Sequence, residues 1–387
     1  MTDQLLKPGW RRYRFDQMAV NVNERVEPGD SDAEYYVGLE HLDSDSLKIR
    51  RWGTPDDVEA TKLRFRRGDI IFGRRRVYQR KLAVADFDGI CSAHAMVLRA
   101  KPDVVLPEFL PFFMQSDLFM NRALEISVGS LSPTINWRTL AAQDFPLPPP
   151  DEQRRLVEVL TASIKVQEAD QQLAVASRAL VNSFSANRLA MHREDYPLVG
   201  MPKLTTRITV GIVVKPAKWY VKDGKGVPAL RSLNVQPGRL DFKNLVHISQ
   251  EAHKIHKKSQ LCSGDVVVIR TGRPGDAAVI PDGLGPLNCI DLVIATPNDH
   301  ILPEYLVALL NSPSGRSSFA AGKTGTAQEH FNVGEFKKLA VPCPELPVQA
   351  RFIEELDTFA KASQSAERRH QQAIEFHVSL VNALVGA

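Results

Sequence analysis

The sequence predicts an α+β fold made of two copies of one unit, each followed by a long helix. Three observations lead to this prediction: the second half of the 387-residue chain repeats the first at an offset of 196 residues, short apolar or β-branched runs follow a Gly-Asp turn in both halves, and a Pro-rich break precedes a long helical segment in each half. Solenoid repeats are only about 20 to 50 residues long, so each copy is expected to hold a core of its own.

The repeat keeps one register from about residue 65 to the end of the chain. Short apolar matches arise by chance, but many matches in one register indicate a tandem duplication, and two such copies are expected to be related by a pseudo-twofold axis. Before residue 65 the register slips, so the front of each copy has diverged most. The matching pairs include Gly68 and Gly264, Asp69 and Asp265, Arg74 and Arg270, LPEFL at 106–110 and LPEYL at 302–306, Asn136 and Asn332, and Gln153 and Gln349.

Each copy is expected to contain strands first and helices later. IIFGR after Gly68-Asp69 and VVVIR after Gly264-Asp265 are short runs opened by a turn signal, as strands are. LPEFLPFFMQS and LPEYLVALLNS have a proline near the first turn of a predicted helix. The predicted division is a first domain at 1–148, a first long helix at 149–190, a second domain at 191–344 and a second long helix at 345–387.

The two long helices are expected to pair as an antiparallel coiled coil. Residues 151–190 contain neither glycine nor proline, and Asp151 and Glu152 favour the positive end of the helix dipole. A coiled coil places apolar residues at alternating spacings of three and four. The alternative is that each helix packs only on its own domain. The predicted seams are Val166, Ala169, Leu173, Ala176, Leu180 and Phe184 in the first helix, and Phe352, Leu356, Phe359, Ser363, Ala366, His370, Ala373, His377 and Leu380 in the second.

Positive charge gathers at equivalent places in both copies although the net charge is only +4. Residues 50–81 hold 11 Lys or Arg against 4 acids, and residues 203–258 hold 12 against 3. Recurrence in both copies favours two polyanion-binding faces over two merely solvated ones. Aromatic residues make up only 7%, which favours duplex over single-stranded DNA. The candidate DNA-binding residues are Lys62, Arg64, Arg66, Arg67, Arg74, Arg75, Arg76, Lys218, Lys222, Lys225, Arg231, Lys254, Lys257, Lys258, Arg270 and Arg273.

No motif for catalysis is complete in the sequence. GKT at 322–324 lacks the earlier glycine of a phosphate loop, since position 317 is Ser317. His253 and His256 could share a helical face, but Lys254, Lys257 and Lys258 would repel a metal cation. We therefore expect a chain that catalyses nothing and binds neither a metal nor a cofactor itself.

The four cysteines and the start of the chain indicate a cytoplasmic protein. Cys91, Cys262, Cys289 and Cys343 lie far apart, without the spacing of a zinc site, and are expected as small buried apolar groups. The first residues lack the apolar run of a signal peptide, and no stretch approaches the ~20 apolar residues of a membrane span. A membrane partner is not expected.

The order of these features resembles the specificity subunits of type I restriction-modification enzymes. The residues that carry the resemblance are GDIIFGR and GDVVVIR, LPEFL and LPEYL, and FPLPPPDEQRRLVEVL with its weaker copy VPCPELPVQARFIEEL. The resemblance covers nearly the whole chain. It implies two target-recognition domains, each reading one half of an interrupted duplex DNA site, with the paired helices as a spacer.

The resemblance also implies partners that supply the chemistry. Two methyltransferase subunits that use S-adenosylmethionine would dock along the helices, and two restriction or motor subunits that use ATP and Mg²⁺ would complete the enzyme. The second copy has Val348 where the pattern has Glu, so a partner contact of that kind is expected only at Glu152. The competing hypothesis is a non-catalytic scaffold whose basic faces are merely solvated. The residues expected to face partners are Glu152, Gln153, Leu156, Leu160, Gln349, Phe352, Leu356 and Phe359.

Overall fold

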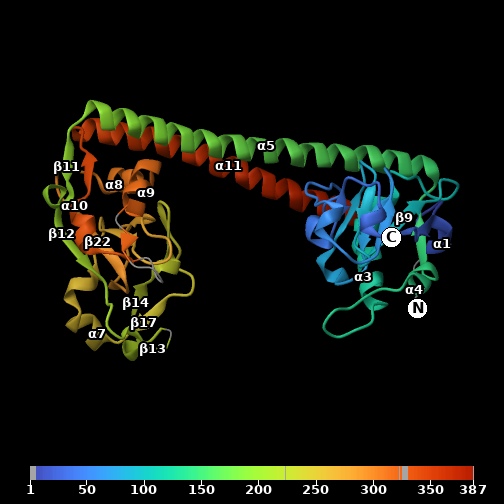
Figure 1. The fold of residues 1–387 in the computed structure, drawn as a ribbon, viewed down its shortest axis with the longest axis horizontal. Coiled ribbons are helices and arrows are strands. Elements are labelled where there is room, and N and C mark those ends of the chain that lie inside the picture. Colours follow the sequence, from blue (N-terminus) through green and yellow to red (C-terminus); the bar gives the residue numbers. More distant parts are fainter. Residues whose placement is uncertain (1–5, 223, 322, 325–329, 387) are drawn as a thin grey trace. The chain divides into compact units, whose positions relative to one another are not determined.

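The structure, a computed structural model, describes residues 6–222, 224–321, 323–324 and 330–386. It divides into two compact units (Figure 1): unit 1 comprises Met1–Gln172 with Glu367–Ala387, and unit 2 comprises Leu173–Ala366. The long helices α5 (Pro150–Asp195) and α11 (Leu346–Val385) each contribute one part to each unit. Helix α5 therefore ends at Asp195 rather than at the predicted residue 190.

Unit 1 is built on two small sheets and a strand pair. The first sheet is antiparallel throughout, and the second contains one parallel pair, β4 with β8. In sheet order the first consists of β2 (Ala19–Val22), β9 (Ala95–Ala100), β6 (Ile70–Gly73) and β7 (Leu82–Val84), the second of β3 (Arg25–Val26), β5 (Lys62–Phe65), β8 (Gly89–Cys91) and β4 (Tyr36–Val37), and the pair of β1 (Arg11–Arg14) and β10 (Asp144–Leu147).

The helices of unit 1 cover the first sheet and close its core. That core is rich in phenylalanine, with Phe15, Phe113 and Phe119 among its fully buried rings. Val381 and Val385, near the end of α11, belong to the same core. The elements are α1 (Phe15–Met18), α2 (Leu110–Gln115), α3 (Asp117–Glu125), α4 (Trp137–Ala141) and the 3₁₀ turns η1 (Pro28–Asp30), η2 (Leu39–His41), η3 (Pro55–Asp57) and η4 (Val77–Gln79).

Unit 2 repeats this plan with additional short strands. Its first sheet is again antiparallel, and its second again contains one parallel pair, β14 with β21. In sheet order the first sheet consists of β12 (Thr205–Val210), β22 (Leu292–Pro297), β19 (Val266–Ile269) and β20 (Ala277–Val279). The second sheet consists of β13 (Tyr220–Val221), β17 (Val246–Ile248), β14 (Val227–Leu230), β21 (Leu287–Cys289) and β18 (Gln260–Leu261). Three separate strand pairs are β11 (Leu198–Gly200) with β25 (Ala340–Pro342), β15 (Val235–Gln236) with β16 (Arg239–Leu240), and β23 (Lys323–Thr324) with β24 (His330–Phe331).

The helices of unit 2 again surround a core on one face of the first sheet. Tyr305, Phe319, Phe336 and Phe352 are fully buried in it. The LPEYL helix, α8, begins at Pro303 as its proline predicts, whereas the LPEFL segment of unit 1 becomes regular helix only at Leu110. The elements are α6 (Met201–Leu204), α7 (Gln250–Ile255), α8 (Pro303–Asn311), α9 (Pro313–Ala321), α10 (Val333–Lys338) and the 3₁₀ turns η5 (Pro216–Trp219), η6 (Ser232–Asn234) and η7 (Lys257–Ser259).

The two first sheets share their strand order and pairing, as the repeat predicts. The orders β2-β9-β6-β7 and β12-β22-β19-β20 place equivalent strands in equivalent positions. Phe72 pairs with Leu82 in unit 1, whereas Val268, 196 positions after Phe72, pairs with Ala277, which is 195 positions after Leu82. Each unit is therefore a mixed helix and sheet fold with its own core, and the repeat extends to the strand order and pairing directions, while the hydrogen-bonded register shifts by one residue.

Within each unit the parts of α5 and α11 run antiparallel. In unit 1, the Ser163 hydroxyl lies 2.7 Å from Nδ1 of His377, and Arg369 pairs with Asp170 at 2.9 Å. In unit 2, the ring of Phe184 lies 4.8 Å from that of Phe359, measured between centroids. In unit 2 the Ser177 hydroxyl also donates to the Ser363 hydroxyl at 3.4 Å. In each unit the partner of the later α5 residue therefore comes earlier in α11, which is the antiparallel order.

Burial within the two units agrees with much of the predicted seam of α11, but most of the predicted seam of α5 is exposed. In α11, Phe352, Ser363, Ala366 and His377 are buried on the face toward α5. In α5, Phe184 faces α11, but the other five predicted seam residues are exposed; the residues that face α11 within the two units include Ser163, Gln167, Asp170, Ala174 and Ser177. The face of α5 that contacts α11 is partly polar, so apolar spacing in the sequence indicates a different face of the helix.

Candidate nucleic-acid interface

A buried carboxylate fixes the start of the equivalent strands β6 and β19. Asp69, 1% exposed, accepts hydrogen bonds from the backbone N–H of Arg66 at 2.8 Å and from Nε of Arg99 at 2.7 Å. Asp265, 0% exposed, accepts from the backbone N–H of Cys262 at 2.8 Å and pairs with Arg207. The repeated Gly-Asp motif is thus a structural element, and it positions the strand that leads to the arginines.

Three consecutive arginines, Arg74 to Arg76, follow β6 at its far end. The backbone carbonyl of Arg74 accepts from the N–H of Ile135 at 3.0 Å, and the N–H of Arg76 donates to the carbonyl of Pro133 at 2.8 Å. Nε of Arg75 donates to the hydroxyl of Ser132 at 2.7 Å. A loop that is distant in sequence therefore holds the arginine segment along its length.

These three arginines have no carboxylate partner among the described residues of the chain. Nε of Arg74 is buried without a hydrogen-bond partner, and Nη1 of Arg75 lies 3.4 Å from Nε2 of His94. Burial, followed by the charges of Arg75, Arg74 and Lys62, lowers the pKa of His94 below its usual value. The imidazole is therefore neutral at pH 7 and adds no charge to the cluster. We call Arg74, Arg75 and Arg76 the arginine cluster; it is a concentration of positive charge that suits a bound anion.

The other candidates of the first basic patch differ in their freedom to bind DNA. The Lys62 side chain is 7% exposed and donates to the carbonyl of Ala60, so the prediction that it contacts DNA directly does not fit its burial. Arg64 pairs with Asp32 at 2.7 Å, and that hydrogen bond and charge lower the pKa of Asp32. Arg66 and Arg67 are exposed, with only a 3.9 Å pairing of Arg66 to Glu24.

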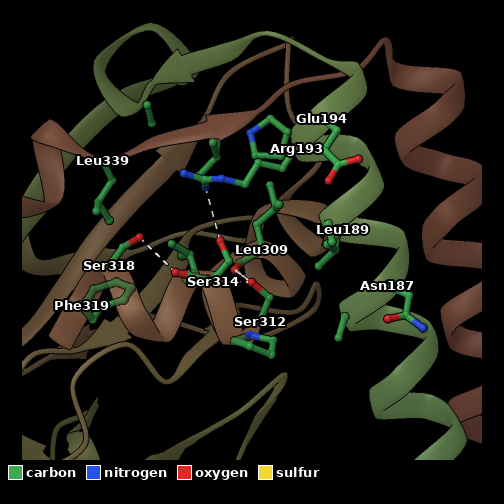
Figure 2. Close-up of a pocket in the computed structure, with 18 residues that line it drawn as sticks. Asn187, Leu189, Arg193, Glu194, Leu309, Ser312, Ser314, Ser318, Phe319 and Leu339 are labelled. Atoms are coloured by element: carbon green, nitrogen blue, oxygen red, sulfur yellow. Dashed lines mark hydrogen bonds between the residues drawn. The ribbon is translucent and has the colours of Figure 1, made fainter. Parts of the chain in front are cut away.

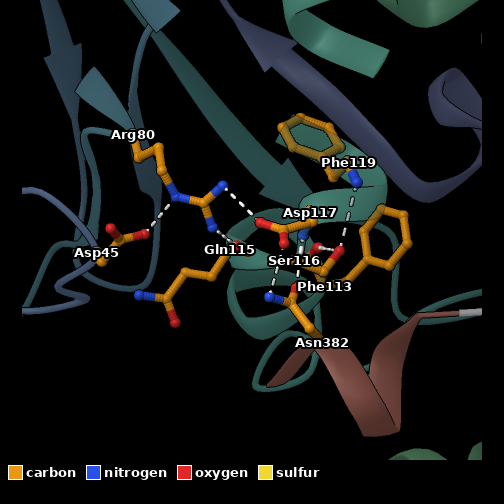
Figure 3. Close-up of polar contacts among 8 residues, drawn as sticks. All are labelled: Asp45, Arg80, Phe113, Gln115, Ser116, Asp117, Phe119 and Asn382. Carbon is orange, nitrogen blue, oxygen red and sulfur yellow. Dashed lines mark hydrogen bonds and ion pairs between the residues drawn. The ribbon is translucent and has the colours of Figure 1, made fainter. Parts of the chain in front are cut away.

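Arg80 follows the arginine cluster in the chain and is held by several polar contacts (Figure 3). Its guanidinium pairs with Asp45 and, at 2.9 Å, with Asp117, and it also donates to the carbonyl of Gln115. The Asn382 side chain of α11 completes the cluster, because it accepts from the N–H of Asp117 at 2.7 Å and donates to the Asp117 carboxylate at 2.8 Å. Arg80, counted in the basic patch but not among the candidates, thus has a structural role.

The equivalent arginines of unit 2 are neutralised within the unit. Arg270 lies 3.4 Å from Asp291, and Arg273 lies 3.4 Å from Asp276. Asp276 also pairs with Arg316 at 2.9 Å. Arg270 follows β19 as Arg74 follows β6, whereas Arg273 corresponds to Val77, and both arginines of unit 2 already have carboxylate partners.

The lysines of the second basic patch are exposed instead. Lys218 lies over the ring of Trp219 at 4.4 Å, and Arg231 donates to the carbonyl of Asn244 at 3.0 Å. Among the described residues none of the lysines has a carboxylate partner. They suit phosphate contacts rather than the reading of base edges. The exposed lysines are Lys218, Lys222, Lys225, Lys254, Lys257 and Lys258.

The two histidines weighed as metal ligands face different partners. Nδ1 of His253 lies 3.1 Å from the Asn288 amide, and the His256 ring packs edge-on against Trp219 with centroids 5.7 Å apart. In the part of the chain that the structure describes, no three His, Cys, Asp or Glu side chains gather as a metal site would require. Gly322 of the GKT motif lies outside the described residues. The cysteine expectation is correct for Cys91 and Cys289, which are buried, but wrong for Cys262, which is exposed.

The two glutamines expected to face a partner are enclosed in their own units. Gln153 is 1% exposed, accepts from the N–H of Leu106 at 2.8 Å and donates to the carbonyl of Pro148 at 2.9 Å. Gln349 is 0% exposed and makes the same bonds to Leu302 at 2.8 Å and to Pro344 at 2.7 Å. Their amides fasten each helix start to its domain and are not available to a partner.

The remaining partner candidates are mostly covered as well. Leu156, Leu160 and Phe352 are buried, and Leu356 and Phe359 are half-buried. Glu152 is half-buried and accepts from the indole N–H of Trp10 at 3.2 Å. A partner of α5 would therefore contact other residues of this helix than those predicted.

In each unit α5 carries exposed apolar residues at spacings of three and four. The large members are Val159, Val166, Leu173 and Leu180, which are 47%, 56%, 46% and 54% exposed. Small side chains alternate with them. In order, the exposed row consists of Val159, Ala162, Val166, Ala169, Leu173, Ala176 and Leu180. Such a row is the signature of a coiled-coil seam without a partner.

A cavity of about 400 Å³ lies in unit 2 between the last turns of α5, the start of α9 and β25 (Figure 2). Leu189 and Phe319 lie on its mostly apolar wall. Arg193 and Glu194 bring opposite charges to it, and Arg193 donates to the Ser314 hydroxyl at 3.3 Å. Without an excess of positive charge this cavity does not suit a polyanion.

Known proteins show what these features resemble. Residues 57–174, which include the arginine cluster and the first half of α5, match the family described as the type I restriction modification DNA specificity domain. The resemblance predicted from the repeat and the helix starts is thereby confirmed. None of the helices within the described ranges is long and apolar enough to cross a membrane.

Relatives of the specificity domain support the same assignment. The EcoDI specificity subunit of Escherichia coli is 28% identical over 183 residues, which are 47% of this chain and 40% of that protein. The EcoKI specificity subunit of Escherichia coli strain K12 is 20% identical over 307 residues, 73% of this chain and 65% of that protein. The chain thus matches less than two thirds of the length of these relatives.

Solved structures show that the fold extends beyond the matched specificity domain. A chain from a study of complex assembly and conformational transition in the type I R-M system has a TM-score of 0.69 at 21% identity, over 99% of both chains. The HsdS subunit of Thermoanaerobacter tengcongensis has a TM-score of 0.51 at 20% identity, over 98% of this chain and 97% of that one. At this identity the likeness is one of fold.

Proposed function

We propose that this chain is the DNA-reading subunit of a type I restriction-modification enzyme. Each unit would read one half of an interrupted duplex site, and the two long helices would pair as an antiparallel coiled coil that joins the units in a pseudo-twofold arrangement. The observation that carries the proposal is the arginine cluster, three cations without a carboxylate partner among the described residues, within the segment that matches the specificity family. Arginine binds phosphate and can also contact guanine through two hydrogen bonds.

The two units would contribute differently to DNA binding. Unit 1 offers Arg74, Arg75 and Arg76, whereas in unit 2 Arg270 and Arg273 already have carboxylate partners. Unit 2 would therefore bind the backbone through its exposed lysines, and base contacts by Arg270 would require separation from Asp291. A protein that acts only as a scaffold would not need the arginine cluster of unit 1, whereas a DNA-binding protein would.

The exposed apolar row of α5 would dock the methyltransferase subunits. In unit 1 a shallow groove of about 310 Å³ beside this row is lined by Val166, Asp170, Arg369 and Phe376. Phe376 is 61% exposed, which is unusual for a large apolar side chain with no partner to cover it. An amphipathic helix of a partner could bury this surface. S-adenosylmethionine would belong to those partners, and ATP with Mg²⁺ to two further motor subunits.

A binding experiment tests the DNA-reading proposal. Full-length protein is titrated into a library of randomised duplexes at several salt concentrations, and bound sequences are selected. We expect affinity that falls steeply with salt and two separated blocks of selected bases. Salt-sensitive binding without any selected bases would leave only a basic surface, and absence of binding would favour the scaffold.

A further inference from the structure

A loop of unit 1 holds two large apolar side chains out in solvent. Leu131 is 93% exposed and Val128 is 78% exposed. The base of the loop is closed by two backbone hydrogen bonds between Val128 and Thr134, at 3.1 and 3.0 Å. Gly129 has a φ of 116°, a conformation that favours glycine and lets the chain turn sharply within this narrow loop. The loop at 128–134 is thus closed at its base, beside Val128, and has an apolar tip formed by Leu131.

The same loop is fastened to the arginine cluster. Thr134 pairs with Arg75 in an isolated β-bridge, and the Ser132 hydroxyl accepts from Nε of Arg75 at 2.7 Å. The N–H of Arg76 donates to the carbonyl of Pro133 at 2.8 Å. The apolar tip and the three unpaired cations therefore form one surface.

This combination fits one class of ligand, a polyanion with an apolar interior. Duplex DNA is such a molecule, since its phosphates surround stacked bases. Proteins that bend DNA insert apolar side chains between base pairs from the minor groove while arginine and lysine hold the backbone. An acidic protein surface would pair with the charges of the arginines, but it has no stacked bases between which Leu131 could insert.

We propose that the loop at 128–134 is a wedge that inserts Leu131 between two base pairs of the half-site bound by unit 1. The inference rests on the proposed DNA-reading function and adds a mode of recognition to it. Insertion would unstack one base step and bend the duplex, and Arg74 to Arg76 would hold the flanking phosphates. Pyrimidine–purine steps unstack most easily, so such a step is expected under the loop.

The test uses full-length protein and a duplex selected from the randomised library. The fluorescent base 2-aminopurine is placed at successive positions, and dyes at the two ends report bending by energy transfer. Wild-type protein is expected to raise the fluorescence at one step and to shorten the end-to-end distance. Leu131→Ala is expected to lose both signals, and Leu131→Phe is expected to keep them. Leu124→Ala, a change at a 38% exposed leucine of α3, serves as the matched control and is expected to behave as wild type.

The outcomes separate the wedge from the proposed function. Because Leu131 is almost fully exposed, the variant is expected to unfold at the same temperature as wild type. Tight, sequence-selective binding by wild type without unstacking or bending would overturn the wedge and leave DNA reading intact. Equal unstacking by Leu131→Ala and wild type would also overturn it. Failure of wild type to bind any duplex would overturn both, and capture of a methyltransferase subunit through Leu131 would make the loop a protein contact instead.

Discussion

Gln153 and Gln349 make matching hydrogen bonds at the starts of α5 and α11. Each side-chain oxygen accepts from the N–H of the leucine that opens an LPE segment, and each amide nitrogen donates to the carbonyl of a proline five residues earlier. The glutamine is therefore repeated because it joins helix to domain. Glu152 and Val348 precede these glutamines, and their difference leaves the join unchanged.

Replacing Gln153 with alanine is expected to lower the free energy of unfolding of unit 1 by about 2 to 4 kcal/mol. The change leaves the N–H of Leu106 and the carbonyl of Pro148 without partners, and an unsatisfied buried polar group costs about 1 to 3 kcal/mol. Urea unfolding followed by circular dichroism measures it. Gln172→Ala, at an exposed site of the same helix, is the control and is expected to change stability by less than about 0.5 kcal/mol. Equal effects of the two changes would contradict the structural role.

Replacing Arg74, Arg75 and Arg76 with alanine is expected to reduce the salt dependence of DNA binding. Each lost phosphate contact lowers the slope of log affinity against log salt by about 0.9, and an arginine that reads a base contributes about 1 to 3 kcal/mol of preference at its half-site. Selection at fixed salt should show that preference at the half-site of unit 2 persists. Arg270→Ala serves as the comparison, and its effect on the slope should be smaller because Asp291 already neutralises Arg270. Loss of preference at the distant half-site alone would contradict independent reading.

Both units are expected to lose stability as the pH falls below about 6.5. His377 and His192 are 4% and 5% exposed, and burial lowers the pKa of each from its usual 6.5. Nearby Asp45 opposes the effect at His377, and Arg188 adds to it at His192. Below pH 6.5 the unfolded chain therefore binds protons that the folded chain does not, which favours unfolding down to the lower folded pKa values. Thermal unfolding between pH 5 and 7.5 checks this, and His377→Gln should flatten the dependence for unit 1. A pH dependence that His377→Gln leaves unchanged would show that other groups cause it.

A lysine in the exposed row of α5 is expected to prevent assembly with methyltransferase subunits. Val166→Lys places a charge where the proposed interface is apolar, and a loss of 2 kcal/mol or more, about 30-fold in affinity, is typical of a central interface position. The fold should be unaffected because Val166 is 56% exposed. Co-purification with the partner subunits measures assembly. Lys165→Ala, at the exposed neighbouring position, is the control; full assembly by Val166→Lys would place the docking surface elsewhere.

Deleting residues 378–387 is expected to destabilise unit 1 and spare unit 2. The deletion removes Val381 and Val385, which are 2% and 0% exposed in the core of unit 1, and burial of a valine contributes about 1.5 to 3 kcal/mol. It also removes the Asn382 contacts with Asp117. Hydrogen exchange resolved by peptide should show faster exchange in unit 1 alone. Equal protection in both units would contradict the assignment of the end of α11 to the core of unit 1.

The sequence alone determined the repeat, the order of strands and helices in each copy, and the placement of positive charge. These features are local or periodic: a Gly-Asp turn before a strand, a proline at a helix start and a cluster of arginines are visible in one dimension. The same signals carried the family resemblance. The face of α11 that is partly buried was also visible, because Phe352, Phe359 and Ala366 keep a regular spacing.

Only the tertiary structure decided which of these residues are free to act. The sequence shows the arginines of both patches alike, but carboxylates distant in sequence neutralise Arg64 and Arg270, whereas Arg74 and Arg75 have no carboxylate partner within the described ranges. The sequence also shows an apolar row on α5. In the structure, polar residues such as Ser163 line the face of α5 toward α11, and the apolar row is therefore exposed. Charge pairing and burial depend on neighbours that only folding brings together, and the candidate interfaces could therefore be located on the sequence but not assigned residue by residue.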